Sequence, residues 1–239
     1  MKKTYTILTI GSALFLGQAQ AEIESEFHVG YNSKYIFRGV DFGDDAYEYG
    51  IDFAGSSNFG LDWSAGIWGI SPDGEDGNTD ELDFYAAVSK TFGATTVSAG
   101  FTVYTFDSSA ASPAGDDAEV FLGVSGDIYG VEAGVTAFFG TDGTYQEQIL
   151  IEVNLGYSFA VYDNVGGNIG LTYGVIADDG SGGYSDGNGG AYFSASFSLD
   201  VPLSDEITFS PYVSYIDGAS RIGGVSDEVI GGGSLSFSF

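Results

Sequence analysis

The sequence predicts an all-β protein, a transmembrane up-and-down antiparallel β-barrel of about twelve strands. Three observations carry this prediction: apolar residues recur at every second position in twelve segments, the connections between segments are alternately short and long, and the chain ends in SLSFSF. A period of two is that of a strand with one apolar and one polar face. Short turns at one end and longer loops at the other are typical of outer-membrane barrels.

The first residues are expected to form a secretory signal peptide over residues 1–21, which leaves residues 22–239 as the barrel. A basic start, MKK, is followed by an apolar run over residues 7–17 and by the small-residue cleavage site AQA at residues 19–21, the three parts of such a peptide. The apolar run is too short to cross a membrane as a helix. No later stretch offers about 20 mostly apolar residues, so a helical membrane protein is excluded.

Composition narrows the class further. The net charge of −28 would repel the phosphates of nucleic acid. A chain that is 44% hydrophobic and 15% aromatic has enough apolar surface to fold, so disorder is not expected despite the acidity. Cysteine is absent, which excludes a disulfide framework and thiol chemistry in an exported protein.

The first six strands are predicted from alternation in order along the chain. The apolar positions are Phe27, Val29, Tyr31, Tyr35 and Phe37; Tyr47, Tyr49, Ile51 and Phe53; Phe59, Leu61, Trp63, Ala65 and Ile67; Leu82, Phe84, Ala86 and Val88; Val97, Ala99, Phe101 and Val103; Val120, Leu122 and Val124.

Six more strands follow by the same alternation. Their apolar positions are Val131, Ala133, Val135, Ala137 and Phe139; Ile149, Ile151, Val153, Leu155, Tyr157 and Phe159; Ile169, Leu171, Tyr173 and Val175; Phe193, Ala195, Phe197, Leu199 and Val201; Ile207, Phe209, Val213 and Tyr215; Val229, Leu235, Phe237 and Phe239.

The connections between these segments predict which ends of the strands lie together. Those at 56–58, 93–94, 126–130, 160–164 and 202–205 are short, whereas those at 71–81, 107–117 and 178–190 are long, acidic and rich in glycine.

A soluble β-sandwich would also alternate, because an antiparallel sheet often has one solvated face. Here the polar face is mostly Gly, Ser, Thr and Asn, with few of the charged residues that coat soluble sheets. Aromatic residues near the strand ends predict the girdles found where a bilayer meets water. The predicted girdle residues are Tyr35, Phe37, Tyr47 and Tyr49 at one rim and Phe59, Tyr157 and Phe159 at the other.

The C-terminal segment is expected to be the last barrel strand. Leu235, Phe237 and Phe239 would face lipid, the serines between them would face inward, and the strand would pair with the first so that no edge lies in the membrane. A strand that ends on an aromatic residue is similar to those that the bacterial barrel-assembly machinery recognises, so this machinery and outer-membrane lipid are expected partners.

The opening of the chain resembles a known family. The segment YNSKYIFRGVDFGDDAYEYGIDFA (residues 31–54) carries Tyr35, Phe37, Arg38 and Gly39 in a Tyr-x-Phe-Arg-Gly pattern that resembles the start of the TorF family of porins. GLDWSAGIWG and ELDFYAAVSKTFG look like that family's third and fourth strands. The resemblance covers about the first hundred residues, and it implies a channel without naming a solute.

Charged residues on the predicted inner face are candidates for lining a pore. In an antiparallel hairpin, a register with a loop over residues 40–47 would place Arg38 opposite Glu48 and Lys34 opposite Asp52. These would be two ion pairs in the lumen, either as a constriction that selects ions by sign or as a structural neutralisation that pins the hairpin.

The same argument extends to the next strands. A register through the turn at residues 56–58 would place Asp62 beside Asp52, with Glu152 at similar depth on the eighth strand. Lys34 against these three acids leaves a negative lumen, which predicts a weak preference for cations.

Two other readings of polar residues are disfavoured. His28, the only histidine, is expected to be a lumen or rim residue, and no serine has the sequence context of a nucleophile. Asp73, Asp76, Asp80 and Glu81 lack the spacing of a calcium loop. No enzyme activity, cofactor or metal is therefore predicted.

The sequence thus predicts a porin-like channel of the bacterial outer membrane, for passive diffusion of small hydrophilic solutes or ions. The alternative is a closed structural or adhesive barrel that presents acidic loops outside the cell. Conductance separates the two, and the oligomeric state is left open.

Overall fold

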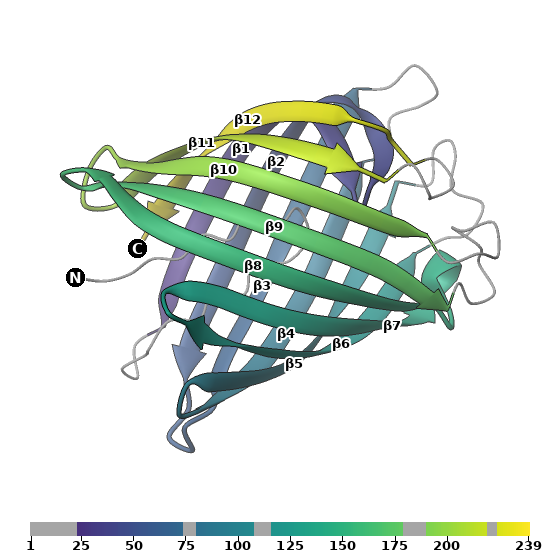
Figure 1. Cartoon of the computed structure of the whole chain (residues 1–239), viewed down its shortest axis with the longest axis horizontal. Coiled ribbons are helices and arrows are strands. Elements are labelled where there is room, and N and C mark those ends of the chain that lie inside the picture. The colour runs from purple at the N-terminus through teal and green to yellow at the C-terminus, as the bar shows by residue number, and fades with distance from the viewer. Residues whose placement is uncertain (1–22, 74–79, 108–115, 179–189, 219–223) are drawn as a thin grey trace.

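The computed structural model describes residues 23–73, 80–107, 116–178, 190–218 and 224–239, which form one closed β-barrel of twelve strands (Figure 1). The strands are β1 (Glu24–Phe37), β2 (Val40–Ser56), β3 (Asp62–Asp73), β4 (Glu81–Phe92), β5 (Thr95–Phe106), β6 (Asp117–Ile128), β7 (Val131–Asp142), β8 (Ile149–Tyr162), β9 (Val165–Asp178), β10 (Ala191–Pro202), β11 (Ile207–Asp217) and β12 (Glu228–Ser238). One short 3-10 helix, η1 (Gly143–Tyr145), follows β7. Within the described ranges, no helix has the length and apolar character needed to cross a membrane.

Each strand pairs antiparallel with its sequence neighbours, and β12 closes the barrel against β1. In the closing pair Phe27 lies opposite Phe237 and Val29 opposite Leu235. Closure leaves every strand paired on both sides, which is the requirement for strands in a medium without water. The predicted strand number, strand order and closing pair are confirmed.

The outer surface of the barrel is apolar. Residues on the predicted lipid-facing positions are exposed on every strand, which in a soluble protein would be an unusually large apolar surface. Examples of these exposed side chains are Phe27, Ile67, Phe84, Phe101, Leu122, Val135, Val153, Leu171, Phe197, Phe209 and Val229.

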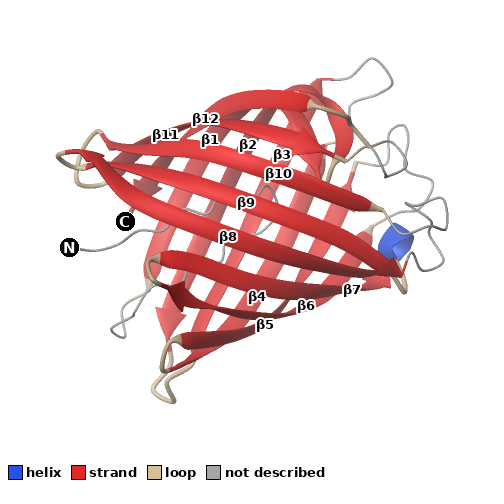
Figure 2. Ribbon diagram, viewed as in Figure 1, coloured by secondary structure: helices blue, strands red, loops and turns tan. Residues whose placement is uncertain are grey.

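The two ends of the barrel differ. The start of β1, the end of β12 and most of the short connections lie at one end, here called the turn end (Figure 2). The strand ends that flank the long connections lie at the other, here called the loop end. The short connections include the two-residue turns Gly93-Ala94, Tyr129-Gly130 and Asp163-Asn164. Most of the predicted long connections fall outside the described residues.

The hairpin between β1 and β2 differs from the prediction in the position of its turn. The prediction placed a loop over residues 40–47, whereas β1 ends at Phe37 and β2 begins at Val40. The turn consists of Arg38 and Gly39, with φ of 50° and 79°, the left-handed values that a tight two-residue hairpin turn requires.

The tip of this hairpin points into the barrel. Tyr35, Ile36 and Phe37 are all at most 5% exposed, and the pairing of β1 with β2 shifts between Tyr35 and Ile36. The assignment of Tyr35 and Phe37 to a membrane-facing girdle is therefore wrong, because an irregularity in the pairing turns the end of the strand inward. Tyr47 and Tyr49, by contrast, are exposed on the outer surface as predicted.

Apolar packing around the hairpin tip fills the interior at the loop end. Three clusters of buried side chains lie there, and together they draw on strands from all around the barrel. They consist of Tyr35, Phe37, Ala46, Ile70, Tyr104 and Tyr145; of Ile36, Tyr212, Ile216, Val225 and Ile230; and of Phe121, Phe138, Leu150, Ile176 and Tyr192.

Candidate channel lumen

The rest of the interior is a chamber of about 1360 Å³ that extends to the turn end. Turn residues such as Gly93, Gly130 and Asn164 lie at its rim. Its wall carries hydroxyl and amide groups on the inward positions of β8 to β12, among them Asn154, Ser158, Asn168, Thr172, Ser194, Ser196, Ser198, Ser210, Ser236 and Ser238. Ser236 and Ser238 face inward as the C-terminal alternation predicts.

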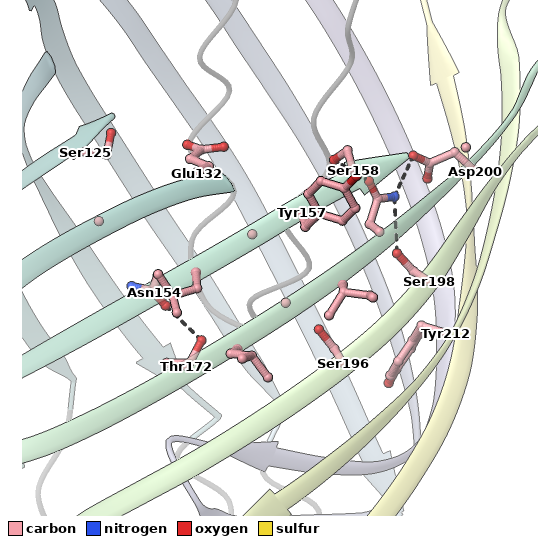
Figure 3. Close-up of a pocket in the computed structure, with 18 of the residues that line it drawn as sticks. Ser125, Glu132, Asn154, Tyr157, Ser158, Thr172, Ser196, Ser198, Asp200 and Tyr212 are labelled. Carbon is pink, nitrogen blue, oxygen red and sulfur yellow. Dashed lines mark hydrogen bonds between the residues drawn. The ribbon is translucent and has the colours of Figure 1, made fainter. Parts of the chain in front are cut away.

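Hydrogen bonds between side chains connect neighbouring strands of the polar wall (Figure 3). The hydroxyl of Thr172 on β9 donates to Asn154 on β8 at 2.8 Å. The amide of Asn168 on β9 donates to Asp200 on β10 at 2.9 Å, and the hydroxyl of Ser210 on β11 donates to the same carboxylate at 3.0 Å. A wall of this kind is wettable, because its groups can exchange bonds with water or with a polar solute.

Acidic residues dominate the charge of the chamber. Among the described residues that line it, Arg38 is the only base. The lining acids are Glu26, Asp127, Glu132, Glu152, Asp163, Asp200, Asp205 and Glu206. Fixed charges of one sign on the walls of a narrow cavity raise the local concentration of counter-ions.

The chamber ends at the tip of the β1–β2 hairpin. Ile36, Phe37, Arg38 and Gly39 line its inner end together with aromatic side chains of the opposite wall. No described residue of the long connections lines the chamber. The hairpin tip therefore separates the polar chamber from the loop end.

Arg38 forms the central contact of this partition. Its Nη1 and Nη2 donate to the two carboxylate oxygens of Glu119 on β6, at 2.9 and 2.7 Å. Arg38 is 7% and Glu119 3% exposed. A two-point arginine–carboxylate pair away from water is among the stronger polar contacts in proteins.

Aromatic rings and a tyrosine hydroxyl surround the pair. The guanidinium lies 4.7 Å from the ring centre of Phe37 and 4.5 Å from that of Phe138, close enough for cation–π attraction. The hydroxyl of Tyr104 donates to Glu119 at 2.7 Å. Arginine keeps its proton in proteins, so the pair is ionic.

Glu152 on β8 also reaches the hairpin tip. One of its carboxylate oxygens lies 3.5 Å from Nε of Arg38 and accepts a hydrogen bond from the hydroxyl of Tyr192. Arg38 therefore links the tip of β1–β2 to the opposite side of the barrel, at β6 and β8.

The predicted partners of Arg38 and Lys34 are wrong. In the observed register Glu48 lies opposite Gly30 and Asp52 opposite Glu26. The error arises because the hairpin turns directly after Phe37, so β2 starts seven residues earlier than the predicted strand at Tyr47 and the whole register slides along the strands.

Lys34 and Glu48 each have other partners. The ammonium of Lys34 lies 2.9 Å from Asp41, 3.5 Å from Asp44 and 3.6 Å from Glu228, at the base of the hairpin tip. Glu48 instead accepts a hydrogen bond from Asn32 at 3.1 Å. Lys34 thus contributes to the loop-end side of the partition rather than to the middle of the lumen.

The predicted grouping of Asp52, Asp62 and Glu152 is also wrong. Asp52 lies opposite Gly66, and Asp62 lies opposite Ser56 near the turn end, where it accepts a hydrogen bond from the Ser56 hydroxyl. The turn spans residues 57–61 rather than 56–58, which shifts the register. Of the six predicted lumen charges, the structure brings together only Arg38 and Glu152.

His28 lies on the inner face next to Asp52. Its Nδ1 is 3.5 Å from one carboxylate oxygen of Asp52, and the other oxygen accepts a hydrogen bond from the hydroxyl of Tyr85. Ser236 is the cross-strand partner of His28 on β12, but the Nε2 edge of the imidazole lies over Gly50 on the opposite neighbour, β2. The ring therefore turns away from the serine that a catalytic pair would require.

The predicted acidic loop is only partly described. Asp76 lies outside the described residues. Asp80 accepts from the hydroxyl of Ser71 at 2.6 Å, and Glu81 is buried and accepts from the hydroxyl of Tyr35 at 2.8 Å. In the described ranges, no three His, Asp or Glu side chains are grouped so that they could hold a metal ion.

Sequence reasoning missed the acids that pack around the partition. Glu81, Asp83, Asp117 and Glu119 are each at most 5% exposed, and Oδ1 of Asp83 has no hydrogen-bond partner among the described residues. A signal was present: acids at alternate positions of β4 and β6 share the face opposite the apolar positions. The contact of Glu119 with Arg38 crosses the lumen, and no local pattern encodes such a contact.

Solved outer-membrane barrels are similar to this fold. The NanC porin aligns with a TM-score of 0.52 and 14% sequence identity over 89% of this chain and 98% of its own. The KdgM porin aligns with a TM-score of 0.51 and 10% identity over 90% and 99%. The translocator domain of the autotransporter NalP from Neisseria meningitidis aligns with a TM-score of 0.52 and 12% identity over 93% and 89%. At these identities the similarity establishes the fold, that of bacterial outer-membrane β-barrels.

Neither a family model nor a curated protein sequence matches this chain. The resemblance of residues 31–54 to the TorF family therefore stays a prediction from the sequence.

Proposed function

We propose that this chain is a porin-like channel of the bacterial outer membrane, for passive diffusion of small hydrophilic solutes or ions. The observation that carries the proposal is the polar chamber of about 1360 Å³ inside a closed barrel. A barrel of twelve strands has more interior than side chains need to fill, and here hydroxyl and amide groups line the unfilled part. Two of the solved barrels with the same fold, NanC and KdgM, are described as porins.

The membrane assignment is supported by the outer surface. Exposed Phe, Leu, Ile and Val side chains on every strand would face water in a soluble protein, but they match the apolar band of an outer-membrane barrel. The loop end would then face the outside of the cell and the turn end the periplasm. Export requires the predicted signal peptide at residues 1–21, which lies outside the described residues.

Assembly into the membrane would use the last strand. The backbone of Phe239 donates to the carbonyl of Ser25 at 3.0 Å, and its side chain is exposed at the outer surface. This position supports the proposal that the assembly machinery binds the terminal aromatic residue before β12 pairs with β1. Deletion of Phe239 should lower the amount of folded barrel in the outer membrane.

Charge supports a weak preference for cations. The acids that line the chamber face only one base, Arg38, and this base is already paired with Glu119. A structure of the KdgM porin contains disordered oligogalacturonate, a polyanion. The acidic chamber of this chain would repel such a ligand, so we propose neutral or cationic solutes instead.

A second function is favoured by a specific observation. The hairpin tip and three apolar clusters occupy the interior at the loop end. A barrel closed in this way could serve as a structural or adhesive surface protein that presents its acidic loops. Permeability to solutes separates this candidate from the channel.

Swelling of proteoliposomes tests the proposal. Residues 22–239 would be refolded into vesicles beside a shortened variant in which residues 34–44 are replaced by Asn-Gly, a sequence suited to a two-residue hairpin turn. If the chain is a channel, small neutral sugars and cationic amino acids should enter the vesicles through the shortened barrel at least. They should enter faster than anionic sugars. Correct folding is checked by heat-dependent migration on gels. Failure of both folded barrels to admit any solute would refute the channel and favour the structural candidate.

A further inference from the structure

The backbone of the segment Ser33–Gly43 pairs with the neighbouring strands β12 and β3 only at its base. The pairing of β1 with β12 ends at Asn32, opposite Gly232. The pairing of β2 with β3 reaches only Asp44, after a shift between Asp44 and Tyr47. Between these limits the two arms pair with each other. The segment is therefore a flap that can be displaced without breaking the ladder that closes the barrel.

The flap lies inside the barrel, and its tip packs on β10 and on the connection between β11 and β12. Gly39, at its tip, packs so closely on Gly218 and Tyr192 that a Cβ atom there would meet either residue at 2.8 Å. The carbonyl of Gly39 accepts from the backbone of Val225 at 2.9 Å, and Val40 forms an isolated bridge with Gly224. These contacts are few, so side chains must supply most of the attachment.

Arg38 supplies the strongest of these attachments. It has a φ of 50°, a left-handed conformation that is strained for a residue with a Cβ. The strained position directs its guanidinium into the two-point pair with Glu119 and toward Glu152. A strained residue held by a buried ion pair across a lumen is suited to a segment with two states, one in which the ion pair is formed and one in which it is released.

We propose that the flap Ser33–Gly43 is a gate, closed in this structure, and that the Arg38–Glu119 ion pair is its latch. The inference rests on the proposed function and adds its regulation. When the latch is released, the flap swings about its base near Asn32 and Asp44 toward the loop end. The polar chamber then becomes continuous with the outside of the cell.

The gate can be tested because the chain has no cysteine. Cross-strand partners in an antiparallel pair have Cα atoms about 4.5–5.5 Å apart, within the range that a disulfide spans. The double substitution Val40→Cys/Gly224→Cys would therefore fasten the flap to the connection between β11 and β12 when oxidised and free it when reduced.

Single-channel recording in planar bilayers gives the readout. The double variant Arg38→Gln/Glu119→Gln removes both charges of the latch, and Glu152 keeps its hydrogen bond from Tyr192. We expect the open probability of this variant to exceed that of the unmodified barrel by about tenfold or more. Addition of the cysteine pair to this variant should abolish the openings under oxidising conditions, and dithiothreitol should restore them. Lys90→Gln, which removes a cation on the outer face of β4, is the matched control and should leave the open probability unchanged.

The outcomes separate the gate from the channel. Openings of the latch variant that depend on the oxidation state of the cysteine pair support the gate. Suppose that the barrel shortened at residues 34–44 conducts. If the folded latch variant then behaves like the unmodified barrel, or if the oxidised cysteine pair conducts as well as the reduced one, the gate is wrong and the channel stands. If the folded, shortened barrel is silent, the channel is wrong and the gate with it.

Discussion

Arg38 and Glu119 are 81 positions apart in the sequence, yet they meet in a two-point ion pair inside the barrel, with N–O distances of 2.9 and 2.7 Å. The pair joins the tip of the first hairpin to β6 across the lumen. It divides the interior into an apolar loop end and a polar chamber. The following expectations concern this partition, the charge of the chamber and the outer surface.

Removal of one partner of the pair should destabilise the barrel. Glu119→Leu removes the two-point partner of the buried guanidinium and leaves Glu152 at 3.5 Å from it, and we expect a loss of about 3–5 kcal/mol in the free energy of unfolding. The double variant Arg38→Met/Glu119→Leu should recover most of this loss, because the remaining acid, Glu152, lines the chamber and keeps its hydrogen bond from Tyr192. Guanidinium titration of refolded barrels in vesicles measures both. Equal losses in the single and double variants would show that packing, not charge, dominates here.

A methyl group at Gly39 should disturb the hairpin tip. Gly39 has a φ of 79°, and a Cβ there would meet Gly218 and Tyr192 at 2.8 Å. Gly93 has a similar φ of 66° in a short turn but nothing within 4 Å of a Cβ, so it serves as the matched control. Gly93→Ala should cost about 1 kcal/mol from backbone strain alone, and Gly39→Ala about 1–3 kcal/mol more from overpacking. Unfolding titrations that give equal costs would contradict the close contact.

Neutralisation of chamber acids should reduce the preference for cations. The triple variant Asp127→Asn/Glu132→Gln/Asp200→Asn removes three charges from the lining without touching the latch. In a salt gradient its reversal potential should move toward zero, with a cation-to-anion permeability ratio about twofold lower. The shift should be larger at about 0.1 M than at about 1 M salt because of screening. Glu147→Gln, an exposed residue that is not part of the lining, should have no effect.

Charge on the outer surface should impair membrane insertion. Val153 is exposed near the middle of β8, whereas its neighbour Asn154 lines the chamber. Val153→Arg should cost about 2–4 kcal/mol at the depth of the hydrocarbon core, and Asn154→Arg should cost much less because its side chain reaches water. The yield of folded barrel in vesicles compares the two. A similar yield for both would argue that the outer face of β8 is not in lipid.

The strands were predictable because alternation is a local property. Phe27, Val29 and Tyr31 are outward, as their spacing indicates, and the same spacing finds all twelve strands and the closing pair of β1 with β12. The prediction fails at Tyr35 and Phe37, which continue the same spacing but point inward. Alternation identifies two faces but cannot show that a bulge has turned a strand end into the lumen.

The site was less predictable than the fold. Antiparallel register depends on where the turn lies, and the residues Arg38 and Gly39 form it directly before the predicted loop over residues 40–47. The predicted cross-strand partners of Arg38 and Lys34 were therefore wrong. The true partner of Arg38, Glu119, belongs to a strand that is not adjacent in the sheet, so only the closed barrel brings the two together.

Single-channel conductance of refolded residues 22–239, recorded beside the barrel in which residues 34–44 are replaced by Asn-Gly, tests the central claim most directly. A water-filled chamber behind a hairpin partition predicts discrete conductance steps in the shortened barrel, with a reversal potential that favours cations, and rarer openings in the complete one. A shortened barrel that is correctly folded and yet passes no current would contradict the claim, because the chamber would then not be part of a pathway across the membrane.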